Sequence, residues 1–289
     1  MDLPEKPKHV HNLEFVRLLT PYVFSLCAAH GKRVLDVGCG FGHGAWLLLT
    51  SGAQRVVALD YDPAKGCQTS KALAGVRCAD VFVMDAQKLA FKDESFDVVT
   101  CFEVIEHVPE PGTLLSELRR VVKRKGIVLL STPNRALRLL PFQRPWNVEH
   151  LREYGLSALR SRLSKHFPSF RVLGVRGRPE PYEFYRKRWR QRPLRAYLGW
   201  AVPLLRDGTP AAVRAWIKGR LREGRPTSSP HSDEGLTSTA IPAPRPEEWP
   251  FFVGNIHTKC LDFFAVCGFE DRLVYNAARH IGLSVCPAT

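Results

Sequence analysis

Short apolar runs alternate with amphipathic segments over the first 175 residues. Strands are predicted where β-branched residues cluster, and helices where apolar residues recur at every third or fourth position. This alternation is typical of a parallel sheet covered by helices. The predicted strands are 33–37, 55–59, 79–84, 96–101, 126–131 and 169–175, and the predicted helices are 43–52, 63–73, 112–122 and 156–166.

The alternation breaks after residue 175. Residues 176–225 hold fourteen Lys or Arg against four Asp or Glu, and so contain most of the excess positive charge of a chain whose formal net charge is +14. Residues 226–250 are rich in proline and small polar residues, which is typical of a flexible linker. A strand-like apolar run returns at 260–267. The middle segment is therefore predicted to be an insertion before the last strand.

These patterns predict an α/β fold that is Rossmann-like and doubly wound, with a mostly parallel seven-stranded sheet. The basic insertion precedes the last strand. The longest lipid-compatible stretch, 198–205, is far shorter than the roughly 20 residues that a membrane-spanning helix needs. With no signal-like N-terminus and no C-x-x-C spacing among the eight cysteines, a cytoplasmic location is expected. The predicted units are an N-terminal helical segment (1–31), a core (32–175), a basic aromatic insertion with linker (176–255), and the last strand with a C-terminal tail (256–289).

Residues 34–44, VLDVGCGFGHG, place a glycine-rich turn between the first strand and the first helix. Glycines let the backbone turn tightly and approach a ligand more closely than a Cβ would allow. Asp60 ends the second predicted strand and Asp85 follows the third. Because ligands of open α/β sheets bind at the carboxyl edge of the strands, these carboxylates are candidates to bind a ligand there.

The segments LDVGCGFG, ALDYD and MDAQKLAF resemble, in order, the first three motifs of class I S-adenosylmethionine-dependent methyltransferases. FDVVTCFEVIEHVPEP and IVLLSTPNR resemble the segments around the fourth and fifth strands of that family. The resemblance covers about residues 32–175 and 260–268. It implies that S-adenosylmethionine is the cofactor, with Asp36 positioning the loop, Asp60 on the ribose and Asp85 on the adenine. The implied cofactor-binding residues are Asp36, Gly38, Gly40, Gly42, Asp60, Tyr61, Asp85, Ala86 and Glu103.

Residues 40–45 also satisfy the G-x-G-x-x-A pattern of a nicotinamide dinucleotide site. That alternative accounts for neither Asp36 nor the later motifs. A third interpretation is that the glycines serve only a tight turn, which leaves Asp60 and Asp85 at matching strand ends unexplained.

The candidate catalytic group is Glu103-Val-Ile-Glu106-His107, just past the fourth predicted strand. If this segment is helical, its two carboxylates and imidazole share one face and could bind a hard cation. His150, in the sequence HLREY, could complete a metal site of Glu103, Glu106, His107 and His150. In the alternative without metal, Glu103 lines the cofactor pocket and His107 either packs or acts alone as the base. The candidate catalytic residues are His107 and Glu106.

The E-x-x-E-H arrangement with a later histidine resembles two O-methylating branches of the family. One comprises the ubiquinone-biosynthesis O-methyltransferases, which act on catechols, and the other comprises the small-RNA 2′-O-methyltransferases, which act on a terminal ribose diol. In both, the resemblance implies a divalent ion such as Mg²⁺. The prediction is O-methylation of a small-molecule, lipid-linked or glycan acceptor; the alternatives are RNA 2′-O-methylation and a non-catalytic cofactor-binding module.

The basic aromatic segment 176–225 admits three interpretations. Its arginines could bind RNA phosphates while its aromatic rings stack on bases. They could instead contact an anionic membrane surface, which the apolar stretch 194–205 favours and which would make the protein peripheral to the inner face of a membrane. The third is a lid over the acceptor pocket. The sequence leaves the identity of the acceptor and the oligomeric state open.

Overall fold

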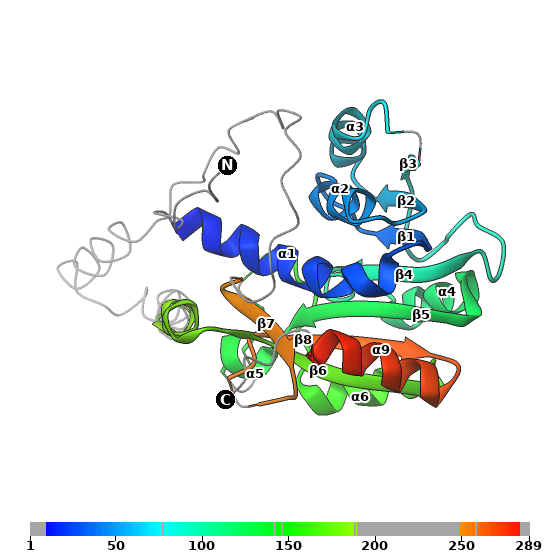
Figure 1. Cartoon of the computed structure of the whole chain (residues 1–289). Helices are drawn as coiled ribbons and strands as arrows, with labels where there is room; N and C mark the ends of the chain where they lie inside the picture. Colours follow the sequence, from blue (N-terminus) through cyan, green and yellow to red (C-terminus); the bar gives the residue numbers. More distant parts are fainter. Residues whose placement is uncertain are drawn as a thin grey trace, which may run out of the picture.

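The computed structural model describes residues 10–76, 78–140, 143–145, 147–187, 189, 249–257 and 259–283. Its centre is a sheet of eight strands in the order β3-β2-β1-β4-β5-β8-β6-β7 (Figure 1). The first five in that order are parallel, whereas β8 runs antiparallel to both β5 and β6. The strands are β1 (Arg33–Val37), β2 (Arg55–Asp60), β3 (Ala79–Val83), β4 (Phe96–Phe102), β5 (Val122–Pro133), β6 (Ser169–Gly177), β7 (Phe251–Gly254) and β8 (Asp262–Gly268).

Helices cover both faces of the sheet, because neighbouring residues of a strand point to opposite sides. Val34 of β1 belongs to a core with Phe24 and Leu48, on the face of α1, α2 and α9. The next residue, Leu35, belongs to a second core with Leu118, on the face of α4 and α6. The helices are α1 (Val10–Ala29), α2 (His43–Thr50), α3 (Pro63–Ala72), α4 (Pro111–Val121), α5 (Arg135–Arg138), α6 (Leu156–Leu163) and α9 (Asp271–Leu283).

The structure confirms the predicted strands and helices of the core, with ends that shift by a few residues. Asp62 caps α3 as its side chain accepts a hydrogen bond from the Ala64 N–H, with Pro63 at the first helical position. The predicted count of seven strands is wrong. The eighth strand, β7, pairs antiparallel with β6 and lies in the segment assigned to the insertion. Its four residues are too few for an alternating pattern to stand out beside the prolines that precede it.

The chain on either side of residues 190–248 packs into the core. Residues 179–187 are helical, and Tyr185 and Trp189 are 0% and 3% exposed. The Tyr185 hydroxyl donates to Glu14, and the Trp249 indole N–H donates to Thr20, both residues of α1. The described aromatic residues of the insertion therefore contribute to the core instead of presenting rings for stacking on bases.

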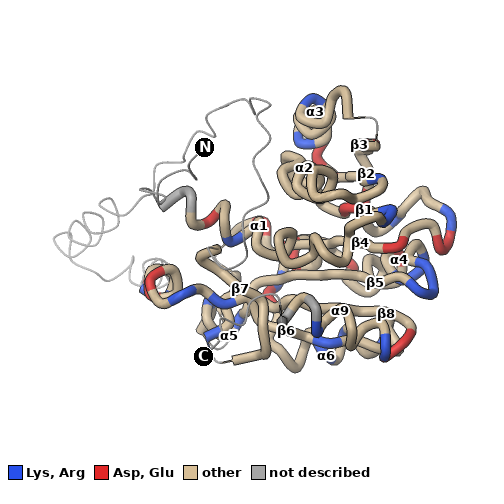
Figure 2. The backbone as a smooth tube through the Cα atoms, viewed as in Figure 1, with Lys and Arg blue, Asp and Glu red and all other residues tan. Residues whose placement is uncertain are grey.

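Most of the basic segment, including 194–205, and the predicted linker up to residue 248 lie outside the described residues. Figure 2 shows basic and acidic residues interleaved along the outer elements of the part of the chain that the structure describes. Within that part, no helix has both the length and the apolar character needed to cross a membrane.

Candidate active site

The glycine-rich turn joins β1 to α2, and its three glycines, Gly38, Gly40 and Gly42, have φ of 74°, 56° and 81°. Residues with a Cβ rarely adopt such angles. A Cβ on Gly38 would lie 2.3 Å from a methyl carbon of Val104, and one on Gly42 would lie 2.7 Å from Thr69. A Cβ on Gly40 would meet no protein atom within 4 Å. Two of the glycines thus permit close packing, and the third leaves an open backbone surface.

Asp60, at the end of β2, holds this turn. Its Oδ2 accepts from the Gly40 N–H at 2.9 Å, and its Oδ1 accepts from the Asp62 N–H at 3.0 Å. Tyr61, the next residue, is 78% exposed. An ionised carboxylate has about four acceptor positions, so Asp60 keeps capacity for further donors such as the hydroxyls of a ribose.

Asp85 and Ala86 lie just beyond β3, in which Val83 pairs with Asp60. The Asp85 carboxylate is exposed and accepts from the Gln87 N–H at 2.8 Å, and Ala86 is buried. These residues and Asp60 therefore follow adjacent strands at one edge of the sheet. Together with the open backbone at Gly40, they fit an adenosine-containing ligand such as S-adenosylmethionine.

Asp36 lies beneath the turn and is fully buried. Its Oδ1 accepts from the hydroxyls of Thr100 at 2.7 Å and Tyr22 at 3.0 Å. Burial raises the pKa of Asp36 to about 6. A Cβ on Gly44 would lie 2.1 Å from the Tyr22 ring, so this glycine lets α1 approach α2 closely. Asp36 thus connects α1, β1 and β4 below the turn.

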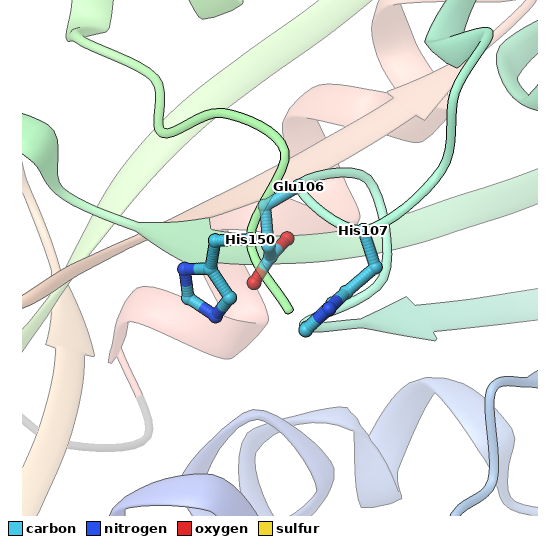
Figure 3. A group of neighbouring side chains, drawn as sticks. All are labelled: Glu106, His107 and His150. Carbon is cyan, nitrogen blue, oxygen red and sulfur yellow. The ribbon is translucent and has the colours of Figure 1, made fainter. Parts of the chain in front are cut away.

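The segment after β4 forms a turn and not a helix. The expectation that Glu103, Glu106 and His107 share one helix face is therefore wrong. Glu103 has φ of 55°, a left-handed conformation that is uncommon outside glycine. This turn still brings one donor atom each of Glu106, His107 and His150 within 4.8 Å of one another (Figure 3). We call these three residues the acceptor cluster. The Glu106 Oε2 accepts from Thr132 at 3.0 Å, whereas its buried Oε1 has no hydrogen-bond partner among the described residues.

Both imidazoles of the acceptor cluster are held through Nδ1. The Nδ1 of His107 lies 3.0 Å from the carbonyl oxygen of Glu149, and that of His150 lies 3.1 Å from Oε1 of Glu153. A carbonyl can only accept, so the His107 Nδ1 carries the proton and its Nε2 keeps a lone pair. The two ring centroids are 4.7 Å apart and the planes are close to perpendicular.

Burial and the neighbouring groups set the protonation of the acceptor cluster. Burial, and then the charge of Glu103, raise the pKa of Glu106 well above its ordinary value. Burial and the nearby His150 lower the pKa of His107. Near neutral pH, and without a bound cation, His107 is therefore neutral and can accept a proton at Nε2.

Glu103 lies apart from the acceptor cluster because of its left-handed backbone. Its Oε1 accepts from the Ser131 hydroxyl at 3.1 Å, and its Oε2 lies 3.7 Å from the Arg17 guanidinium. Arg17 in turn donates to Asp262 at 2.5 Å. Burial and the charge of Asp262 raise the pKa of Glu103 to about 7. The structure thus brings three of the four expected metal ligands together and places Glu103 in a second buried group.

Sequence reasoning missed the residues that surround these groups, namely Arg17, Asp262, Arg138 and Glu153. Arg17 and Asp262 do leave a signal, since each is a charged residue inside a mostly apolar helix or strand, and buried charges are normally paired. Glu153 and Arg138 leave none, because Glu153 lies in a loop and Arg138 in the short helix α5, where charged residues are ordinary.

Residues 35–130 match the family described as "Methyltransferase domain". Over 129 residues the chain is 37% identical to a "Probable S-adenosylmethionine-dependent methyltransferase" of Mycolicibacterium smegmatis, covering 45% of this chain and 49% of that protein. Over 137 residues it is 39% identical to a ubiquinone biosynthesis O-methyltransferase of Xanthomonas campestris pv. campestris, covering 46% and 55%. The chain thus spans about half the length of these curated relatives.

Among solved structures, the YcgJ protein of Bacillus subtilis is similar at 21% identity and a TM-score of 0.48, covering 91% of this chain and 100% of that one. The strand order of the sheet argues against the alternative of a nicotinamide dinucleotide site. The dinucleotide-binding sheet has the order 3-2-1-4-5-6, whereas here the antiparallel β8 lies between β5 and β6. Residues 35–130 therefore match a methyltransferase domain, and they lie in a sheet whose strand order differs from that of the dinucleotide-binding fold.

Proposed function

We propose that this protein transfers the methyl group of S-adenosylmethionine to an oxygen of a small-molecule, lipid-linked or glycan acceptor. The observation that supports this most is the acceptor cluster, in which a neutral imidazole lies beside a buried carboxyl oxygen that has no described partner. Val104, between Glu103 and the cluster, packs on Gly38 of the turn. The proton-accepting group and the proposed cofactor site therefore share one edge of the sheet.

In the proposed reaction, Gly40 and Asp60 hold the cofactor while the acceptor oxygen attacks the methyl carbon in line with the sulfur. The oxygen–carbon bond forms as the carbon–sulfur bond breaks, and the electron pair of that bond remains on sulfur. The acceptor hydroxyl gives its proton to Nε2 of His107, which acts as general base. Glu106, whose pKa is raised by burial, lies beside His107 and is proposed to hydrogen-bond the acceptor.

The acceptor cluster also fits a divalent cation, since it offers one buried carboxylate oxygen and two imidazoles. Glu106, His107 and His150 would hold the ion, which lowers the pKa of a coordinated hydroxyl. Imidazole ligands suit zinc, iron or nickel, whereas Mg²⁺ prefers oxygen, so the expected Mg²⁺ is the poorer match. If a cation is needed, a chelator abolishes turnover and a metal restores it; full turnover in chelator leaves His107 as the base alone.

The acceptor class is tested by incubating the protein with S-adenosylmethionine labelled in its methyl group and with separate lipid, polysaccharide and RNA extracts. Label in the lipid or polysaccharide fraction supports the proposal, and alkali-resistant label at a ribose in RNA supports the alternative. Cofactor binding without label in any fraction supports a non-catalytic module. The similarity to a ubiquinone biosynthesis O-methyltransferase favours the lipid fraction.

For residues 176–225 we propose contact with an anionic membrane surface while the lipid-linked acceptor is bound. The excess of basic residues and the apolar stretch 194–205 support this. Sedimentation with vesicles that contain anionic lipid, compared with RNA binding over a range of salt concentrations, separates the two partners. Both kinds of binding weaken as salt increases, but only an apolar contact with lipid retains some binding at high salt.

A further inference from the structure

Glu153 and Arg138 form a buried ion pair directly behind the acceptor cluster. The side chains of Glu153 and Arg138 are 0% and 4% exposed, and the Arg138 Nε lies 3.3 Å from the Glu153 Oε1. The same Oε1 lies 3.1 Å from Nδ1 of His150. The three side chains thus form a chain that runs from Arg138 through Glu153 to the imidazole.

The direction of the hydrogen bond follows from the chemistry of the groups. An ionised carboxylate only accepts hydrogen bonds, and the Arg138 guanidinium provides the opposite charge that a buried carboxylate needs. The Nδ1 of His150 must then carry a proton, which leaves Nε2 as the ring nitrogen that Glu153 does not engage. His107 shows the same arrangement with a backbone carbonyl in place of the carboxylate.

The position of Arg138 is fixed in turn by the first helix of the insertion. The guanidinium carbon lies 5.4 Å from the centre of the Trp189 ring, close enough for a cation–π interaction. Trp189 is itself buried beside Tyr185. Residues far apart in the sequence, 138, 153 and 189, therefore converge behind one imidazole.

We propose that Glu153 is a positioning residue that fixes His150 as the Nδ1–H tautomer with Nε2 in the acceptor cluster, and that Arg138 holds the Glu153 carboxylate in place for this purpose. This inference deepens the proposed function and rests on it only for its effect on turnover. Outer partners of this kind fix the ring orientation of histidines that bind metals or protons, and removing them commonly lowers metal affinity or activity about 10–100-fold.

The direct test is a long-range ¹H–¹⁵N correlation spectrum of the ¹⁵N-histidine-labelled full-length protein at pH 8, with a His150→Gln variant to assign the signals. In the wild-type protein we expect a protonated Nδ1 and an unprotonated Nε2 at His150. A protonated Nε2 in the wild-type protein overturns the proposal, whatever the activity, so the test does not depend on a variant that folds or on methyl transfer.

Glu153→Gln removes the charge and keeps the shape, and we expect a mixture of His150 tautomers with a kcat about 10–100-fold lower and an unchanged KM for S-adenosylmethionine. Arg152→Leu is the matched control. Arg152 holds the same loop by donating to the carbonyls of Val108 and Pro109 and does not bond to His150. It should lower the unfolding midpoint but leave the tautomer as in the wild type.

Two results would overturn the proposal at this step. One is an unchanged tautomer in Glu153→Gln, which would make the ion pair only a structural contact of the loop. The other is an equal tautomer change in Arg152→Leu, which would make it a general effect of loosening the loop. If the tautomer responds as expected but no acceptor is methylated in any variant, the positioning role stands and the proposed function fails.

Discussion

The cofactor side and the acceptor side of the site differ in how their polar atoms are paired. On the cofactor side, both oxygens of Asp60 accept backbone N–H groups, and Asp36 accepts two hydroxyls. The acceptor side comprises the acceptor cluster and the neighbouring buried group of Glu103, Arg17 and Asp262; there, Glu106 Oε1 and Asp262 Oδ1 are buried without a hydrogen-bond partner among the described residues. A buried polar atom without a partner costs about 1–3 kcal/mol.

This difference separates a side that is organised before any ligand binds from one that gains free energy when a ligand supplies the missing partners. On the cofactor side, substitutions should disturb the turn or the binding of one ligand. On the acceptor side, substitution of a carboxyl whose buried oxygen has no partner among the described residues should affect turnover more than folding. The predictions below test that division.

The largest expected effect comes from the acceptor side. His107→Ala removes the proposed base, so kcat should fall by about 10²–10⁴-fold, whereas the affinity for S-adenosylmethionine should change little. The measurements are methyl transfer to the labelled fraction and calorimetric titration of the cofactor. His166→Ala is the control, because His166 contacts Ser116 on α4 and not the cluster. Wild-type turnover by His107→Ala would remove the residue from the mechanism.

On the cofactor side, Gly38→Ala and Gly40→Ala should separate folding from binding. At Gly38 the left-handed φ and the overlap of a new Cβ with Val104 both destabilise the folded state, so the unfolding free energy should fall by about 2–5 kcal/mol. At Gly40 only the left-handed φ opposes the substitution, so the unfolding free energy should fall by about 1 kcal/mol. The new Cβ projects into the open surface and should weaken cofactor binding. Denaturant unfolding and calorimetry measure the two effects. Equal stability losses, or full affinity in Gly40→Ala, would contradict this account of the turn.

A third prediction concerns pH. The pKa of Asp36 is raised from 3.8 to about 6 in the folded protein, so the folded state binds more protons than the unfolded state between these values. Ionisation of Asp36 therefore destabilises the folded protein. This penalty is absent below pH 4 and complete above pH 6, where it amounts to about 3 kcal/mol. Asp36→Asn should remove this cost, so that its stability relative to the wild type rises between pH 4 and pH 6. If the difference in unfolding free energy between Asp36→Asn and the wild type were the same at pH 4 and pH 6, the folded protein would not raise the pKa of Asp36.

The smallest expected effect is at Asp60. Asp60→Ala removes the carboxylate that binds the Gly40 N–H and that is proposed to bind the ribose, so cofactor affinity should fall about 10–100-fold. Asp80→Ala is the matched control, since Asp80 pairs with Arg55 on the surface of the same strands. Unchanged affinity in Asp60→Ala would leave the ribose role without support.

The difference between the cofactor side and the acceptor side also explains how much of the fold and the site could be predicted from the sequence. The strands, the turn of Gly38 to Gly42 and the cap at Asp62 depend on residues close together in the chain, and local patterns show them. Glu103 was expected beside Glu106 and His107, but its left-handed φ turns it toward Arg17 and Ser131. No pattern in one sequence reports such an angle for a glutamate.

The contacts of the acceptor side join positions far apart in the chain. Arg17 meets Asp262 across 245 residues, and Arg138 lies against Trp189 of the insertion. Such contacts depend on the packing of α1, β8 and the helix 179–187 around the sheet, which single-sequence periodicity does not determine. The short strand β7 was missed for a related reason, because its place is set by pairing with β6.

The most direct measurement of the central claim is calorimetric titration of the wild-type protein with S-adenosylmethionine and, separately, with a nicotinamide dinucleotide. The account predicts one site per chain for S-adenosylmethionine, displaced by S-adenosylhomocysteine, and no heat with the dinucleotide. Binding of the dinucleotide, or no heat with S-adenosylmethionine from a folded protein, would contradict it.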